Sequence, residues 1–354
     1  MRKHKRVAAS LLLGLAAVGF AYYVLPQIVD LGGTLKRLRS GNPRWLVLGV
    51  PLEAISLASY VMLFRVVLSR NVRRIGWKAS YQIAMAGGGA TKLFAAAGSG
   101  GVAVTVWALR GAGLSGDAVA EGLLSLEILN YGVYMCALVI FGGGLWLGVF
   151  AGGAPAVLTL VPALLGLGVI VVVLSMHWLA GPAERFMLRH AGRPRARSAG
   201  RWRAVAHIPR ALQNGVNGAV GIVRGRDRSW LAAVPAWGFD IAVLWASFRA
   251  FGHSPPAAPL IMGYYVGTFG NLLPLPGGIG GVEGGMVGSF IGFGVSGSLA
   301  VVAVLAYRTI SYWLPLLPES LGYLQLRGTV SAWRRRDDGR TQRPSAPSGT
   351  PDSE

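Results

Sequence analysis

Prolines, glycines and one carboxylate interrupt an apolar region late in the chain. The segment 274–283 reads PLPGGIGGVE; it contains Pro274 and Pro276 and ends with Glu283. Backbone this rich in Pro and Gly does not continue an α-helix. In hydrocarbon, broken backbone is tolerated only where protein covers it or where it borders a wet cavity, and an ionisable side chain there marks a functional site. The segment therefore predicts a binding site for a polar group inside a membrane.

The apolar run that follows this segment contains Arg308, so Glu283 and Arg308 are the first expected ion pair. Glu127 is a second candidate partner for Arg308, because a faint internal repeat makes their positions equivalent. A charge at the centre of a membrane helix costs on the order of 2.5–3.5 kcal/mol on insertion scales, so such side chains should face the interior and pair. The alternative for each pair is that it only fastens two helices together.

Three more ionisable side chains, Lys92, Glu53 and Asp240, lie in apolar segments. Lys92 is expected to meet Glu53. For Glu53 and Asp240 we expect positions near the membrane interface, where the side chain carries its charge to water. The single cysteine, Cys136, excludes a disulfide framework, and the five histidines show no ligand spacing. No metal, cofactor or catalytic residue is predicted.

The composition allows one broad class. The 354 residues are 53% hydrophobic and 14% charged, the mean hydropathy is +0.50, and several apolar runs reach the roughly 20 residues that cross a bilayer. We therefore expect an all-α polytopic membrane protein. The net charge of +20 would suggest nucleic acid in a soluble protein. Here the arginines gather between apolar runs, where topology and anionic headgroups account for them, and no nucleic-acid partner is expected.

Two Gly-rich segments, 79–112 and 258–293, differ from the other apolar runs. At about 35 residues each, they are too long for one untilted span and too short for two. We predict that each forms a broken re-entrant helical hairpin, beside about six full spans. The distribution of basic residues places both termini in the cytoplasm, with the protein in a bacterial inner membrane. The predicted full spans are 7–25, 45–68, 117–141, 154–179, 230–251 and 298–323.

The rest of the chain is polar. The predicted transmembrane domain, 1–325, includes a basic cytoplasmic loop at 182–229. Within that loop, residues 204–223 are expected to form an amphipathic helix on the membrane surface. Residues 326–354 begin basic and become rich in Pro, Ser and Thr, which predicts a disordered cytoplasmic tail.

Two parts of the chain resemble each other faintly. Residues 111–116 read GAGLSG and residues 292–297 read GFGVSG, at an offset of 181 residues. Each follows a hairpin and precedes a span, which defines repeat 1 at about 44–141 and repeat 2 at about 229–323. The charge map gives the copies opposite orientations, an inverted repeat of the kind found in secondary transporters. The alternative is that small residues only let helices pack closely.

The stretch 274–283, with Arg308, Tyr312 and Pro315, resembles the membrane region of lysylphosphatidylglycerol synthases and their flippase-like relatives, which carry a P-x-P-G-G-x-G-x-x-E signature. The resemblance covers about 7–325 and implies movement of a polar-headed or isoprenoid-linked lipid between leaflets. The first hairpin departs from the pattern, because it lacks the proline and the charges often found in that copy. No aminoacyl-transferase domain follows before residue 354, so lysyl transfer from tRNA is not expected.

The leading hypothesis is a non-enzymatic lipid translocator, in which a wet groove between the hairpins holds the headgroup of a polar or anionic lipid. Half-helix N-termini at 277–281 would add donors for a phosphate. The alternatives are an accessory protein for a cell-envelope glycosyltransferase or lipid synthase, and a membrane-embedded transferase, for which no nucleophile or acid/base pair is found. The predicted groove residues are Pro274, Pro276, Gly277, Gly278, Gly280, Glu283, Arg308, Tyr312, Lys92, Asn271 and Glu127.

Overall fold

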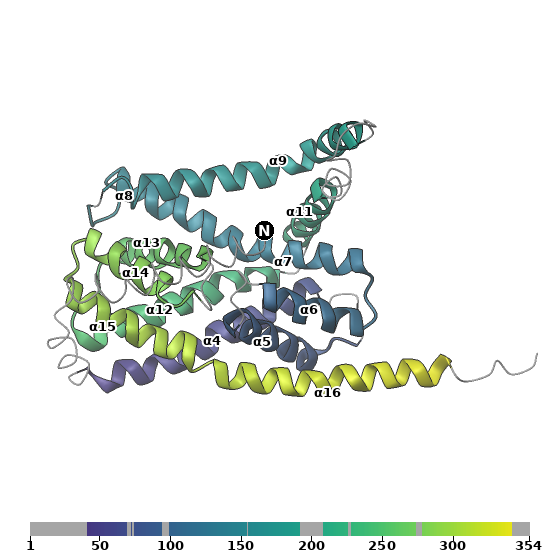
Figure 1. Ribbon diagram of the computed structural model, residues 1–354. Coiled ribbons are helices and arrows are strands. Elements are labelled where there is room, and N and C mark those ends of the chain that lie inside the picture. Colours follow the sequence, from purple (N-terminus) through teal and green to yellow (C-terminus); the bar gives the residue numbers. More distant parts are fainter. Residues whose placement is uncertain are drawn as a thin grey trace, which may run out of the picture.

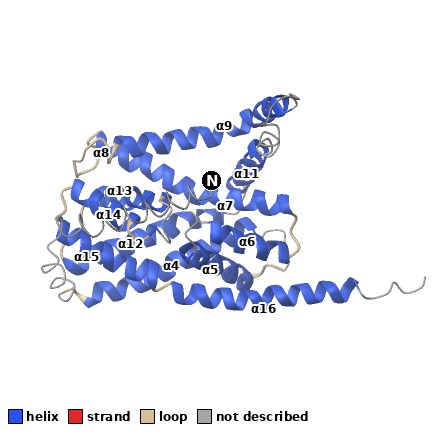
Figure 2. Ribbon diagram, in the orientation of Figure 1, coloured by secondary structure: helices blue, strands red, loops and turns tan. Residues whose placement is uncertain are grey.

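The structure is a computed structural model, which describes residues 41–68, 72, 74–93, 99–153, 155–191, 208–225, 228–273 and 278–341. Within these residues every regular element is a helix, and the predicted all-α class is confirmed there (Figure 2). The predicted first span, 7–25, and the tip of each hairpin lie outside them. The elements are α4 (Pro43–Leu68), α5 (Trp77–Leu93), α6 (Ser99–Gly111), α7 (Gly116–Ala137), η1 (Leu138–Gly142), α8 (Gly143–Trp146), α9 (Leu160–Ala191), α11 (Ile208–Arg224), η2 (Arg228–Ala232), α12 (Ala233–Phe251), α13 (Ala257–Thr268), η3 (Phe269–Leu272), α14 (Gly281–Gly292), α15 (Gly297–Arg308), η5 (Thr309–Trp313) and α16 (Leu316–Thr341).

In the described part of the chain, four helical stretches are long and apolar enough to cross a membrane. Pro43–Leu68, Gly116–Trp146 and Arg228–Phe251 agree with predicted spans. The fourth, Gly297–Arg336, begins where predicted and runs further. A shorter apolar helix, Leu160–Met176, lies where another span is predicted. The total of six spans stays a prediction.

The helices α4 and α12, neighbours in Figure 1, pack against each other. The hydroxyl of Ser56 donates to the carbonyl oxygen of Ala236 at 2.7 Å. Further along, a Cβ at Gly49 would be in ordinary contact with Val243 of α12, at 3.6 Å, and 2.8 Å from Ile310 of η5. Residue numbers rise on one helix as they fall on the other, so the two helices run antiparallel. The small side chains at these points let the two backbones approach closely.

Each predicted hairpin consists of two short helices packed side by side, α5 with α6 and α13 with α14. In the second hairpin a Cβ at Gly263 would be 2.4 Å from Phe290, and one at Gly270 would be 2.2 Å from the backbone of Gly281. The pairing is therefore antiparallel, and glycine is required where the arms approach. None of the four helices exceeds 17 residues, which is shorter than the roughly 20 residues of a full span.

The predicted disordered tail is wrong as far as Thr341, because α16 continues to that residue. Leu326, Val330 and Trp333 are buried in the core with residues of α5 and α6. Their spacing places them on one face of the helix. This burial stabilises a helix whose last turns are rich in charge. Figure 1 shows α16 in yellow as a long helix beside α5 and α6.

The amphipathic helix predicted at 204–223 is present as α11. Its apolar face, with Val216, Ala219 and Ile222, is buried. A Cβ at Gly215 would lie 2.5 Å from Leu124 of α7, which shows how closely the two helices pack. The apolar face is therefore covered by protein, where the sequence predicted that it would lie on the membrane surface.

The two halves contain the same elements in the same order. A long helix (α4 or α12) is followed by a short-helix pair and then by a helix that begins after Gly-x-Ser, at Gly116 in α7 and at Gly297 in α15. Ser115 caps α7, accepting from the N–H of Ala118 at 3.2 Å. This order agrees with the faint repeat in the sequence. The opposite orientation of the halves in a membrane stays a prediction.

Candidate functional site

The predicted pair of Glu283 and Arg308 is confirmed. Glu283 is the third residue of α14, and its Oε2 accepts from the N–H of Gly280 at 2.7 Å, which caps the helix. Its Oε1 accepts from Nε of Arg308, at the end of α15, also at 2.7 Å. A carboxylate in the first turn also interacts favourably with the helix dipole. The sequence predicts open N–H donors for a phosphate at 277–281. The N–H of Gly280 is not open, because it already donates to Glu283.

The break before α14 needs glycine for conformational reasons. Gly278 and Gly280 have φ values of +65° and +84°, a region that other residues rarely adopt. A Cβ at Gly278 would also lie 2.2 Å from the side-chain oxygen of Asn271, so Asn271 closes over the turn. The other predicted groove residues of this segment, Pro274, Pro276 and Gly277, lie outside the described residues.

The first hairpin presents a base where the second presents an acid. Lys92, in the last turn of α5, pairs with Glu319 of α16, with 2.8 Å between Nζ and Oε1. The predicted partner, Glu53, is wrong for this ion pair, although it remains within electrostatic range of Lys92. Glu319 is absent from the predicted groove residues. It is an acid inside an apolar run, LLPESLGYL, so the reasoning that selected Glu283 applies to it equally.

Tyr312 joins the two ion pairs. Its ring faces Cζ of Arg308 at 4.2 Å and Nζ of Lys92 at 5.4 Å from the ring centroid, both within the range of cation–π attraction. Its hydroxyl donates to the backbone oxygen of Lys92 at 3.1 Å. Tyr312 lies in η5, a π-helical turn, and such turns are frequent at functional sites. The predicted residues Glu283, Arg308, Tyr312 and Lys92 thus form one cluster, here called the paired-tip cluster, which also includes Glu319.

One member of each ion pair reaches the surface of the protein. The side chains of Glu283 and Lys92 are 21% and 19% exposed, whereas those of Arg308 and Glu319 are 10% and 3% exposed. Large apolar side chains are also exposed in both hairpins, at Leu93 directly after Lys92 and at Leu272 in the arm opposite the one that carries Glu283. The paired-tip cluster therefore combines accessible charge with accessible apolar surface, an arrangement that suits an amphipathic ligand.

Two other acids are not where the sequence placed them. Glu53 and Asp240, expected near the interface, lie in the middle of α4 and α12, where Glu53 is buried and Asp240 is half-buried with its Oδ1 atom inaccessible. Oδ2 of Asp240 accepts hydrogen bonds from the hydroxyls of Tyr264 and Tyr307. These carboxyl groups are surrounded by neighbouring helices, whereas the sequence predicted that they would reach water. The periodicity of a single helix does not show which helices will pack around it.

Glu127 does not join the paired-tip cluster. It lies on α7 within electrostatic range of Tyr60 and Tyr131. The carboxylate paired with Arg308 is that of Glu283, so the second candidate partner from the sequence is wrong.

Comparison with known proteins agrees with this layout. The sequence profile of the lysylphosphatidylglycerol synthase TM region matches residues 7–318. The chain belongs to this family. UPF0104 membrane proteins of Methanothermobacter thermautotrophicus are similar to it: one match is 43% identical over 82 residues, covering 23% of each chain, and another is 32% identical over 110 residues, covering 29% of this chain and 33% of the relative. A third is 23% identical over 328 residues, covering 88% of this chain and 93% of the relative.

Membership of the lysylphosphatidylglycerol synthase TM-region family identifies a membrane protein. The family is described as the transmembrane region of the synthases, and the relatives are named only as membrane proteins. The first two matches span about a quarter and a third of the length of those curated relatives.

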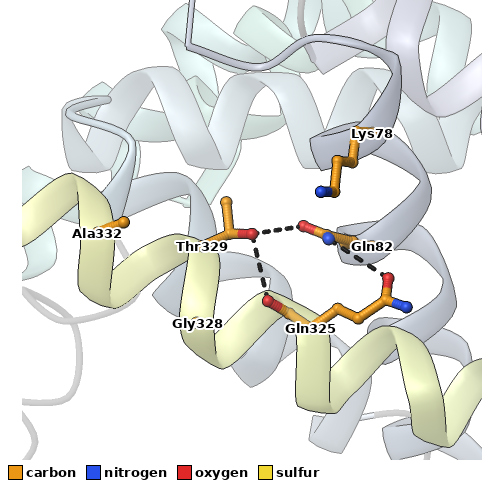
Figure 3. A pocket seen from close by; sticks show the side chains of 6 residues that line it. All are labelled: Lys78, Gln82, Gln325, Gly328, Thr329 and Ala332. Atoms are coloured by element: carbon orange, nitrogen blue, oxygen red, sulfur yellow. Dashed lines mark hydrogen bonds between the residues drawn. The ribbon is translucent and has the colours of Figure 1, made fainter.

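This family member also has a cleft away from the ion pairs. It has a volume of about 480 Å³ and lies between α5 and α16 (Figure 3). Thr329 donates to the side-chain oxygen of Gln82 at 2.8 Å, and Lys78 reaches toward them from the first turn of α5. Lys78 and Lys92 are fourteen residues apart on α5, or about 21 Å at 1.5 Å per residue. The cleft is therefore separate from the paired-tip cluster. Its lining residues are Lys78, Gln82, Gln325, Gly328, Thr329 and Ala332.

Proposed function

We propose that the protein moves a lipid with a polar, anionic headgroup, or an isoprenoid-linked lipid, between the two leaflets of the membrane. The observation that carries this proposal is the paired-tip cluster, where two ion pairs at the tips of two broken hairpins share one tyrosine. A structural fastening of helices would favour full burial of each pair. Here Glu283 and Lys92 are each about one-fifth exposed, and the hairpin that carries each of them also exposes a leucine.

The chemistry of the cluster favours a phosphate-containing headgroup. Lys92 and Arg308 supply the cations, and each is held by a carboxylate rather than by a second base. An anionic headgroup that enters between the tips binds Lys92 or Arg308 in place of its carboxylate, and the displaced Glu319 or Glu283 then needs a proton or another cation as its partner. The exposed apolar side chains meet the beginning of the acyl or prenyl chains, which stay in the lipid.

The two-half architecture supplies a means of movement. If the halves are inverted in the membrane, rocking of one against the other opens the space between the hairpin tips to each leaflet in turn. The close glycine contacts within each hairpin make it a rigid unit, so rocking displaces whole hairpins. In this scheme the ion pairs exchange partners during the cycle while the helical pairs remain intact.

Reconstitution of the purified protein into liposomes tests the proposal. Fluorescent phosphatidylglycerol, aminoacylated phosphatidylglycerol and prenyl phosphate are each placed in both leaflets, and loss of the protected inner-leaflet signal to an impermeant quencher is followed. We expect acceleration for at least one of these lipids. Glu283→Gln should abolish it, whereas Glu121→Gln, a matched change on the exposed face of α7, should not.

The outcomes separate the remaining functions. If none of the three lipids moves faster than in empty liposomes, translocation of these lipids is excluded and a non-transporting accessory role becomes the better account. Acceleration that survives Glu283→Gln and is lost in Lys78→Gln would place the headgroup in the α5–α16 cleft instead of the paired-tip cluster.

A further inference from the structure

Glu53 and Asp240 face each other where α4 crosses α12. The antiparallel register set by Ser56 with Ala236 and by Gly49 with Val243 brings Glu53 opposite residues 239 and 240. The two carboxyl groups are within electrostatic range of each other. They come from equivalent helices of the two halves, so the contact lies between the halves.

Both acids lie deep within their helices. Glu53 is ten residues from the beginning of α4, or about 15 Å at 1.5 Å per residue, which is half the thickness of the hydrocarbon core. The residue is 5% exposed. A carboxylate left unpaired at this depth would be costly, because nothing replaces its hydration.

One oxygen of each acid lacks a partner. Among the described residues, Oε2 of Glu53 and Oδ1 of Asp240 are buried and accept no hydrogen bond. The other oxygen of Asp240 accepts from Tyr264 and Tyr307. A carboxylate that accepts two hydroxyl donors is arranged to be ionised, whereas Glu53 has no donor aimed at Oε2. The unsatisfied atoms therefore call for a donor between the two acids.

The surrounding charges do not balance the two acids. Lys92 and Arg308 lie within electrostatic range of Asp240, and Lys92 also within range of Glu53. Both bases already form ion pairs in the paired-tip cluster. The titratable and charged groups that interact with the two acids are Lys92 on α5, Tyr264 and Tyr265 on α13, Tyr307 and Arg308 on α15, and Glu319 on α16.

We propose that Glu53 and Asp240 form a proton-binding site in which one exchangeable proton is shared between Oε2 of Glu53 and Oδ1 of Asp240. A hydronium ion gives its proton to one carboxylate oxygen: one O–H bond of hydronium breaks, the O–H bond of a carboxylic acid forms, and water is released. The new O–H supplies the missing donor to the facing acid. Among the described residues no group of three or more His, Cys, Asp or Glu side chains is placed to hold a metal ion, which favours the proton.

The location of this site gives the proton a role in the cycle. With the proton bound, the acids attract each other and hold α4 against α12; without it they repel, and the contact between the halves loosens. In this coupling, which rests on the proposed lipid translocation, a proton gradient biases the direction in which the headgroup moves. The proton site itself does not depend on that function.

Infrared spectroscopy of the purified full-length protein tests the site directly. The carbonyl band of buried, protonated carboxyl groups is recorded in H₂O and D₂O for the wild type, Glu53→Gln, Asp240→Asn and the control Glu121→Gln. We expect a deuterium-sensitive band that is lost in both site variants and retained in the control. Gln and Asn keep the shape of the side chains, and thermal melting in detergent identifies any variant that fails to fold.

Three results would overturn the proton site. One is a band unchanged in both folded variants, another is its absence from the wild type, and the third is its replacement on addition of Na⁺ but not K⁺, which would make the site a sodium site. The coupling is tested in liposomes, where a pH gradient should change the initial rate of lipid movement in the wild type but not in Glu53→Gln. Retention of the band in a protein that moves no lipid would remove the coupling and the proposed function while leaving the proton site in place.

Discussion

The two hairpins have the same build and opposite charge at their tips. In the first, the tip base Lys92 ends α5; in the second, the tip acid Glu283 begins α14. Each charge suits its helix end, because a cation is stabilised at a C-terminus and an anion at an N-terminus. Related architecture thus supplies both signs of charge to one region of the molecule, and the difference arises from which arm of the hairpin carries the charge.

The counter-charges are not distributed so evenly. Arg308 and Glu319 both come from the last candidate span, Gly297–Arg336, and Tyr312 lies between them on that span. The C-terminal span therefore contacts both hairpin tips, whereas the equivalent span of the first half, with Glu127, contacts neither through an ion pair among the described residues. Movement of one hairpin relative to the other therefore has to break or rearrange at least one ion pair with this span.

The largest expected effect comes from breaking the second tip. Arg308→Ala leaves Glu283 and its capped helix without the cation, and it also removes the contact with Tyr312. We expect the free energy of unfolding in detergent to fall by about 3–5 kcal/mol. Arg249→Ala, which removes an arginine stacked on Trp45, is the matched control and should cost less than about 1 kcal/mol. Equal destabilisation by both would show that the second tip is no more than a surface ion pair.

Breaking the first tip should cost less. Lys92→Met leaves Glu319 buried without its cation, but Lys92 is partly exposed, so water can reach the vacated position. We expect a loss of about 2–3 kcal/mol in the same melting experiment. Lys78→Met, on the same helix and in the cleft, is the control and should leave stability within about 0.5 kcal/mol. A loss for Lys92→Met that exceeds the loss for Arg308→Ala would reverse the order of the two tips.

The packing of the hairpin arms gives a third comparison. A Cβ at Gly270 meets the backbone of Gly281 at 2.2 Å, whereas a Cβ at Gly284 meets nothing within 4 Å. Gly270→Ala should therefore destabilise by roughly 1–2 kcal/mol, because backbone has to move. Gly284→Ala should raise stability by about 0.5–1 kcal/mol through helix propensity. Melting of the pair in parallel measures the difference, and equal values would mean that the arms are not packed closely.

Some of the ion pairs and helices described above can be predicted from the sequence, and others cannot. Glu283 and Arg308 were predicted to pair because the hairpin leads directly into the helix that carries the arginine. The helical extension to Thr341 was predictable in principle, since Leu326, Val330 and Trp333 have helical spacing, but the charged composition favoured disorder. Glu319 was also predictable as a site residue, because it is an acid inside an apolar run.

The proximity of Glu53 and Asp240 could not be predicted from the sequence. They are separated by 187 residues, and their contact depends on the register of two long helices. Two small residues of α4, Ser56 and Gly49, mark that register through their neighbours Ala236 and Val243 on α12. A single sequence shows that those residues are small and does not show which helix they contact. The ion pair between Lys92 and Glu319 was missed partly for the same reason.

The smallest expected effect tests the link between the two tips. Tyr312→Phe keeps the ring between Arg308 and Lys92 but removes the hydroxyl that donates to the backbone of Lys92. One hydrogen bond of this kind contributes about 1 kcal/mol, so melting should show a loss of that size. Tyr312→Leu also removes the ring and should cost more. A double-mutant cycle combines Tyr312→Phe with Lys92→Met, and we expect the loss of unfolding free energy in the double variant to differ from the sum of the two single losses. Additive losses would mean that the two tips are two independent ion pairs.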